Sequence, residues 1–166
     1  HEAVQERRNI EVDLRAALKR NELELFYQPL VSIETSEIIG YEALLRWNSP
    51  KRGPVSPAEF IPEAESLGLM TTIGGWVLEQ GCQTLAEWEK TPELRHLTLS
   101  INVSTSQLMH EDFVDFVHET LVKTRALPER LILELTESVL VTDIELVIAK
   151  LIALRALGIT LSLDDF

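Results

Sequence analysis

Short apolar runs of strand character alternate along this chain with longer segments of helical periodicity. Strand patterns cover residues 23–28, 38–47, 97–103, 131–135 and 159–163, and helical patterns cover residues 2–20, 57–67, 73–90, 111–125 and 142–157. In the later units the alternation recurs with a period of about 30 residues, which favours a parallel sheet covered by helices. The pattern leaves open whether the sheet is open or closed into a barrel, and each crossover is expected to be right-handed.

Local signals predict where these elements begin and end. Pro29 is expected to end the first strand, and Gly68 and Gly158 are expected to stop two helices. Three pairs of residues have the spacing of helix caps: Ser56 with Glu59, Ser104 with Gln107, and Thr142 with Glu145. The last helix is expected to pack through one apolar side, made of Ile144, Val147, Ile148, Leu151, Ile152 and Leu157.

The composition is that of one globular domain. The chain has 166 residues, 45% of them hydrophobic and 25% charged, and this length supports a sizeable core. Its formal net charge of −12 argues against broad binding to DNA, RNA or anionic membranes. A small phosphate ligand stays compatible with that charge, because a metal ion or an arginine can reverse the local field. The one cysteine, Cys82, is expected to pack as a small apolar residue in a reducing compartment.

The sequence also bears on location. No signal peptide is predicted, because the first residues are charged and polar. The longest apolar region, residues 146–163, is interrupted by Lys150 and Arg155 and is not expected to span a membrane. We therefore expect a cytoplasmic domain, whether or not a longer parent protein carries a membrane anchor.

Polar side chains recur near the ends of several predicted strands. Because side chains alternate along a strand, Glu42 shares one face with Gly40 and Arg46, and its apolar neighbours take the other face. The same alternation gives four separate strands a polar residue on the corresponding face: Glu42, Asn102, Glu134 and Asp164. This face suits the inside of a barrel, and the C-terminal ends of such strands are where barrels and open α/β sheets place their chemistry.

Three carboxylates and one amide at a single rim form an all-oxygen ligand set. Such a set is wrong for structural zinc and suits Mg²⁺ or Mn²⁺. The neighbouring Asp165 could hold a second ion or orient a water. With two hard cations an in-line displacement at phosphorus becomes accessible, because the ions activate a water and neutralise charge on the phosphate.

In these residues the chain resembles the EAL family of bacterial cyclic di-GMP phosphodiesterases. Four motifs match in order over nearly the whole chain: Glu42-Ala43-Leu44 with Leu45-Arg46, Asn102-Val103-Ser104, Glu134-Leu135-Thr136-Glu137, and Asp164-Asp165-Phe166. Tyr27-Gln28-Pro29 and residues 56–62 match as well. The ordered set makes the resemblance specific, whereas Glu-Ala-Leu alone would carry no weight.

The resemblance implies a fold and a reaction. The fold is an α/β barrel of the TIM type whose first strand runs antiparallel to its neighbour, with about the first five of its strands present here. The reaction is hydrolysis of cyclic di-GMP to linear pGpG with Mg²⁺ or Mn²⁺. By position, Glu42, Asn102, Glu134 and Asp164 resemble metal ligands, and Asp165 belongs to the second metal site. Glu42 and the two aspartates are then the catalytic residues of this chain.

Three further residues match positions with other roles in the family. Gln28 and Arg46 resemble substrate contacts, with Arg46 directed toward phosphate. Glu137 resembles the residue that steadies a loop linking the metal site to the family's dimer interface. Plainer alternatives stay open, namely an ion pair between Arg46 and Glu42, an ordinary strand-end amide at Gln28, and a helix-capping role for Glu137.

The same resemblance suggests how the domain is delimited. Residues 1–20 are expected to form a linker helix of the kind that follows a GGDEF cyclase domain, and residues 21–166 an EAL domain that is truncated at its C-terminus. The family's barrel continues with a glycine-containing loop, a lysine, a second glutamate serving as general base, and a glutamine. Since these lie beyond residue 166, we expect the chain alone to hydrolyse little or nothing. We also expect a homodimer or an exchange of segments to cover the open sheet edge.

Two other functions compete with the phosphodiesterase. One is a non-catalytic receptor for cyclic di-GMP, and the other is a dimerisation or scaffold module with a vestigial barrel. Receptor relatives commonly lose the first glutamate or other metal ligands. This chain keeps each ligand that its length allows, which favours an enzymatic parent protein.

Overall fold

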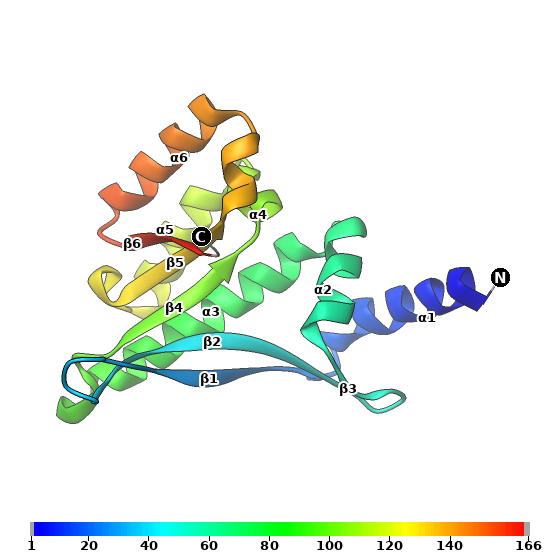
Figure 1. Cartoon of the computed structure of the whole chain (residues 1–166), viewed down its shortest axis with the longest axis horizontal. Coiled ribbons are helices and arrows are strands. Elements are labelled where there is room, and N and C mark those ends of the chain that lie inside the picture. Colours follow the sequence, from blue (N-terminus) through cyan, green and yellow to red (C-terminus); the bar gives the residue numbers. More distant parts are fainter. Residues whose placement is uncertain (1, 165–166) are drawn as a thin grey trace.

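The structure is a computed structural model that describes residues 2–164, with only the backbone described for Arg7 and Asp164. Its elements, in chain order, are α1 (Glu2–Ala17), β1 (Leu23–Val31), β2 (Ile38–Ser49), β3 (Gly53–Val55), α2 (Pro57–Ser66), α3 (Met70–Glu89), η1 (Pro92–Leu94), β4 (Thr98–Val103), α4 (Thr105–Met109), α5 (Phe113–Thr124), η2 (Pro128–Arg130), β5 (Leu131–Thr136), η3 (Glu137–Val141), α6 (Ile144–Ala156) and β6 (Thr160–Asp164). Figure 1 shows α3 and α5 lying along the sheet and α1 extending away from it.

The sheet has the topology that the alternation predicts. Its main strand order is β1-β2-β4-β5-β6, and β3 pairs with the end of β2. β1 runs antiparallel to β2, whereas β2, β4, β5 and β6 are mutually parallel. The α/β fold with an antiparallel first strand is therefore confirmed, and within the described residues the sheet is part of a barrel rather than a closed one.

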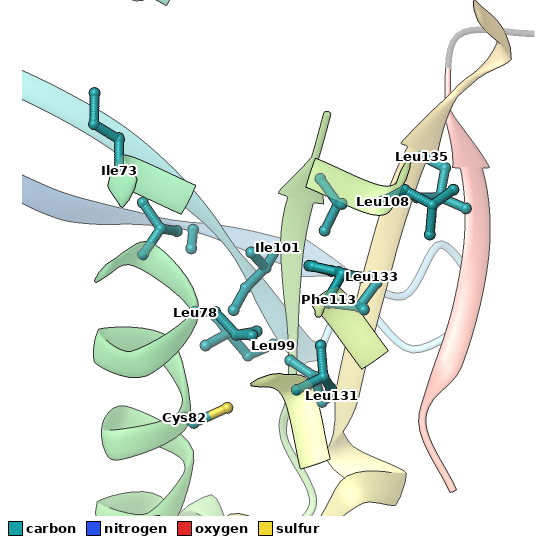
Figure 2. Close-up of a cluster of buried hydrophobic side chains, with 14 of the residues drawn as sticks. Ile73, Leu78, Cys82, Leu99, Ile101, Leu108, Phe113, Leu131, Leu133 and Leu135 are labelled. Atoms are coloured by element: carbon teal, nitrogen blue, oxygen red, sulfur yellow. The ribbon is translucent and has the colours of Figure 1, made fainter. Parts of the chain in front are cut away.

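The core lies between the sheet and its helices. On the helix-facing side of β4 and β5 the apolar side chains are almost fully buried, and they meet α3 and α5 (Figure 2). Gly81 allows α3 its close approach, because a Cβ there would lie 2.5 Å from Ile101 Cδ1. Cys82 is buried beside it, and burial raises the pKa of its thiol to about 12. The predicted apolar packing role of Cys82 is thus confirmed.

Helix α1 is docked on the rest of the chain. Ile10, Leu14 and Ala17 are buried in the same core as Trp47, whose ring packs edge-on to Phe60 with the ring centroids 5.6 Å apart. The Arg52 guanidinium, in the turn before β3, donates to Asp13 on α1 at 3.1 Å. A buried hydrogen bond from Trp47 Nε1 to Glu22 Oε1, 3.0 Å long, fixes the segment between α1 and β1. The predicted linker helix is therefore held against β2 and α2.

Several predicted element ends need correction. Pro29 does not end the first strand, which continues to Val31. β1 is an edge strand of the described sheet, where the missing N–H of a proline is tolerated. The short strand β3 was not predicted, because its Gly-Pro-Val sequence has the composition of a turn.

Only one of the three predicted caps forms as expected. Ser104 and Gln107 make a complete capping box, which starts the short helix α4. Ser56 precedes α2 without a side-chain capping bond, so its predicted box is wrong. The box at Thr142 is also wrong, because Asp143 is the N-cap and accepts from the Leu146 N–H at 3.3 Å. The Thr142 hydroxyl instead donates to the Val139 carbonyl at 2.7 Å.

The predicted apolar side of the last helix is wrong in part. On α6 the buried residues are Val147, Lys150 and Leu154, while Ile148 and Ile152 are 49% and 64% exposed. α6 follows β5 and precedes β6, the last described strand, so no described element covers that flank of the helix. None of the helices between residues 2 and 164 combines the length and apolar character needed to cross a bilayer.

Candidate functional site

The strand register brings Gln28, Glu42, Asn102 and Glu134 to one face of the sheet. Glu42 pairs with Gln28 on β1 and with Ser100 on β4. Asn102 on β4 lies directly opposite Glu134 on β5. Thr136, two residues beyond Glu134, pairs with the backbone position of Asp164 on β6. Since each pairing preserves the face, Glu42, Asn102 and Glu134 share one face of three neighbouring strands, and the backbone position of Asp164 continues this diagonal onto β6.

The burial of this face differs from that of the helix side. Leu99, Ile101 and Val103 on β4 are buried under the helices, whereas Asn102 between them is exposed. Glu42 and Glu134 are half-buried. The oxygen atoms of this face are therefore accessible to a ligand at the C-terminal ends of the strands.

The donor chemistry fits a hard divalent cation. Two carboxylates and an amide on adjacent strands are the oxygen ligands that Mg²⁺ and Mn²⁺ prefer. Among the side chains that the structure describes, no group of three His, Cys, Asp or Glu residues is arranged to hold a metal ion. Asp165 and the side chain of Asp164 lie outside the described residues, and Asn102 contributes an amide, so the five-residue ligand set stays a prediction.

A cleft opens beside this face because two neighbouring strands part. β4 pairs with β2 only through residues 98–101, whereas β2 continues to Ser49 along a different course. The cleft between them has a volume of about 560 Å³. Its described lining comes from β2, α2, α3, β4, α4, the end of β5 and η3: Ala43, Leu44, Leu45, Arg46, Pro57, Ile61, Glu65, Met70, Gly74, Val77, Asn102, Val103, Ser104, Thr105, Ser106, Gln107, Thr136 and Ser138.

Arg46 lines this cleft, and its role as a substrate contact stays a prediction. Its guanidinium lies 5.5 Å from the centroid of the Phe26 ring and donates to its neighbour's carbonyl, Leu45 O, at 3.1 Å. Within residues 2–164 no ion pair joins Arg46 to Glu42, so that alternative is not formed. Gln28 is exposed opposite Glu42 on β1, which places its amide on the same face.

The loop after β5 is tied to α4 by hydroxyl groups. The Ser138 hydroxyl lies 2.7 Å from that of Thr136 and 3.1 Å from that of Thr105. Glu137 begins η3 with its side chain exposed, and the Thr136 side chain makes no capping bond there. Thr136 and Ser138 thus make the hydroxyl contacts described for this segment, and the stabilising role of Glu137 stays a prediction.

Two cleft residues were missed by the sequence reasoning. The Ser106 hydroxyl on α4 donates to Glu65 Oε2 on α2 at 2.7 Å, and both residues line the cleft. They are 41 positions apart, so no local spacing links them. Only the arrangement of α2 against α4 brings them together, and that arrangement depends on where β2 leaves the sheet.

Comparison with known proteins yields extensive matches. A model of the EAL domain family matches residues 11–166. An uncharacterised signalling protein of Caulobacter vibrioides is 42% identical over 99% of this chain, which covers 20% of that protein. The bifunctional diguanylate cyclase/cyclic di-GMP phosphodiesterase MucR of Pseudomonas aeruginosa is 40% identical over 93% of this chain, which covers 22% of it.

A solved structure extends the likeness to three dimensions. The PaMucR phosphodiesterase in complex with cyclic di-GMP superposes with a TM-score of 0.91 and 39% identity, over 95% of this chain and 64% of that one. The chain thus spans about a fifth of the length of the curated relatives and less than two thirds of this solved structure. The fold, the ordered strand-end motifs and the match over residues 11–166 together establish that this chain belongs to the EAL domain family.

Proposed function

We propose that the chain is the N-terminal part of a metal-dependent phosphodiesterase domain that hydrolyses cyclic di-GMP to linear pGpG. The observation that carries this proposal is the shared face of Glu42, Asn102 and Glu134 on three adjacent strands, next to a cleft that holds Arg46. Membership of the EAL family and the likeness to a phosphodiesterase bound to cyclic di-GMP support it.

Mg²⁺ or Mn²⁺ is the proposed cofactor. Glu42, Asn102 and Glu134, with Asp164, would hold one ion, and Asp165 would serve a second. When bound, the ions supply Lewis-acid polarisation of the phosphate and activation of a water. We assign the catalytic role in this chain to Glu42, Asp164 and Asp165.

The remaining residues bind and orient the substrate. Arg46 is a permanent cation in the cleft and can pair with a phosphate oxygen, which offsets repulsion from a chain of net charge −12. Gln28, opposite Glu42, offers amide donors and an acceptor to the polar parts of the ligand. Ser104 and Gln107, locked in their capping box, keep the chain rigid directly after Asn102.

The experiment that tests this function compares binding with turnover. Cyclic di-GMP is titrated into the chain by calorimetry with and without Mg²⁺, and pGpG formation is followed with Mn²⁺. We expect metal-dependent binding with little or no turnover, because the general base and lysine expected from the resemblance lie outside residues 1–166. Turnover at the rate of a complete domain would contradict the expected inactivity of the chain. Absence of binding with and without Mg²⁺ would contradict the proposal that cyclic di-GMP is its ligand.

We further propose that another chain, or an exchanged segment, covers the open flank of the sheet, and that a GGDEF or sensor domain precedes α1 in the parent protein. A groove of about 590 Å³ between α6 and β6 supports the first part, since Ile152 and Leu163 line it and are 64% and 42% exposed. Sedimentation of the chain is the test. A stable monomer at low concentration would count against a homodimer or segment exchange.

A further inference from the structure

A second cavity, separate from the cleft, lies between α3, α4 and α5 and has a volume of about 180 Å³. The rings of Phe113 and Phe116 on α5 and the backbone at Gly75 on α3 form its walls, so its surface is mostly apolar. An apolar protein cavity of about 150 Å³ is large enough to take up benzene. None of the described residues that line this cavity belongs to the predicted site. The cavity therefore has the size and the lining for one aromatic ring that the proposed function does not use.

Gly75 keeps this cavity open. A Cβ at this position would lie 3.3 Å from Cζ of the Phe116 ring, so an alanine methyl would displace a ring that itself lines the cavity. Glycine inside a helix is less favourable than alanine, and Gly75 lies inside α3. The space between α3 and α5 thus depends on the absence of a side chain at residue 75, although that absence weakens the helix.

A carboxylate lies beside the apolar walls of the cavity. Asp112, the N-cap of α5, lines the cavity, is exposed and makes no side-chain capping bond. Among the described residues it has no ion-pair partner, and it is the one carboxylate in the described lining. Its backbone N–H donates to Nδ1 of His110 at 3.2 Å, and Lys150 donates to the His110 carbonyl at 2.9 Å. These bonds fix the segment, so the carboxylate is placed to pair with a cationic group on a ligand.

Gln107 separates this cavity from the cleft, because it lines both. Its amide lies against Gly74 on α3, where a Cβ would overlap it. Its Oε1 accepts from the Ser104 N–H at 3.1 Å, in the capping box that begins α4. Ser104 follows the end of β4, two residues after Asn102. A molecule in the cavity therefore lies beside the side chain that fixes the backbone next to a proposed metal ligand.

We propose that this cavity is a regulatory binding site for a small aromatic amine. The ring of the ligand fills the space between Phe113 and Phe116, and its ammonium group pairs with Asp112. The site is distinct from the substrate and metal sites of the proposed function. Because Gln107 borders both the cavity and the cleft, occupancy of the cavity acts on the backbone beside Asn102.

The test uses benzylamine and toluene as probes, because they share the ring and differ in the ammonium group. Each is titrated into the ¹⁵N-labelled chain, and binding is followed by the amide signals in NMR spectra. Gly75→Ala alters the cavity and Asp112→Asn removes the charge. Thr72→Ala and Asp115→Asn are the matched controls, since both residues are exposed on α3 and α5 and neither lines the cavity. Circular dichroism checks that each variant is folded.

We expect the unaltered chain to bind benzylamine more tightly than toluene. Asp112→Asn should weaken benzylamine by about 2- to 5-fold, the range of an exposed ion pair, and should leave toluene unchanged. Asparagine caps helices as well as aspartate does, so α5 should stay intact. Gly75→Ala should weaken both probes by at least about 10-fold, because the displaced Phe116 ring overpacks the occupied site. Both control variants should bind as the unaltered chain does.

The same spectra test the connection to the cleft. Saturation with benzylamine should shift the amide signals of Ser104 and Gln107 and leave those of β6 in place. Absence of saturable binding by the unaltered chain, or unchanged affinity in Gly75→Ala, would refute the site. Unchanged signals at Ser104 and Gln107 would refute its regulatory role. Neither the probes nor the signals require cyclic di-GMP, so failure of the proposed function would be seen separately.

Discussion

Helix α6 is richer in apolar residues than helix α3, yet its side chains are the more exposed of the two. α3 lies against β4 in the middle of the sheet and buries Ile73, Val77, Leu78, Cys82 and Leu85. α6 lies beside the last described strand and leaves much of its apolar surface exposed. Since both helices have the sequence of a core element, the difference shows that the position of a helix in the sheet decides its burial as much as its own periodicity does.

The largest effect is expected from a substitution in the core between α3 and β4. Ile101→Ala should lower the free energy of unfolding by about 2–5 kcal/mol, because Ile101 is 1% exposed and packs against the helix at Gly81. Denaturant unfolding followed by circular dichroism measures this loss. A change below about 1 kcal/mol would mean that the α3 contact is looser than its burial indicates.

An intermediate effect is expected at the buried polar contact of α6. The Lys150 ammonium donates to the His110 carbonyl at 2.9 Å, and Lys150 is 8% exposed. Lys150→Met should cost about 1–3 kcal/mol in the same assay, because it leaves that carbonyl without this donor. Lys90→Met is the matched control, since its ion pair with Glu87 is fully at the surface and should contribute less than about 1 kcal/mol. Equal losses in both variants would contradict the anchoring role of Lys150.

The smallest effect is expected on the exposed side of α6. Ile152→Ser should change the unfolding free energy by no more than about 0.5 kcal/mol in the dilute chain, since the side chain is 64% exposed. The same denaturation assay at low and high protein concentration checks this. If the variant is much less stable than the unaltered chain, and only at high concentration, then another copy of the chain covers this surface in solution.

The sheet could be predicted from the sequence because its signals are local. Alternation along residues 97–103 and 131–135 separates a buried leucine-rich face from the face of Asn102 and Glu134, and the register preserves that separation. Gly158 follows the end of α6 with a φ of +98°, a backbone conformation that glycine adopts easily, so its position in the sequence predicted the helix end. The capping box at Ser104 was equally readable, since both of its hydrogen bonds lie within four residues.

Features that depend on distant segments could not be predicted. The burial of Lys150 follows from the position of the His110 carbonyl, which lies 40 residues away in the chain. The cap at Asp143 displaced that expected at Thr142 because η3 supplies a carbonyl partner for the threonine hydroxyl. The cleft itself arises where β2 and β4 separate, and no local pattern of apolar and polar residues predicts that point. The polar residues at the strand ends could therefore be predicted from the sequence, whereas the hydrogen bond between Ser106 and Glu65 could not.

The reversed direction of β1 has a mechanical consequence. Because β1 runs against β2, its first residues pair with the last part of β2, and Glu24 lies opposite Arg46. The preceding Glu22 is bonded to Trp47, the residue next to Arg46. A movement of α1 would therefore reach Arg46, the proposed phosphate contact, across a few residues, whereas a parallel first strand would place the end of α1 beside the other end of β2.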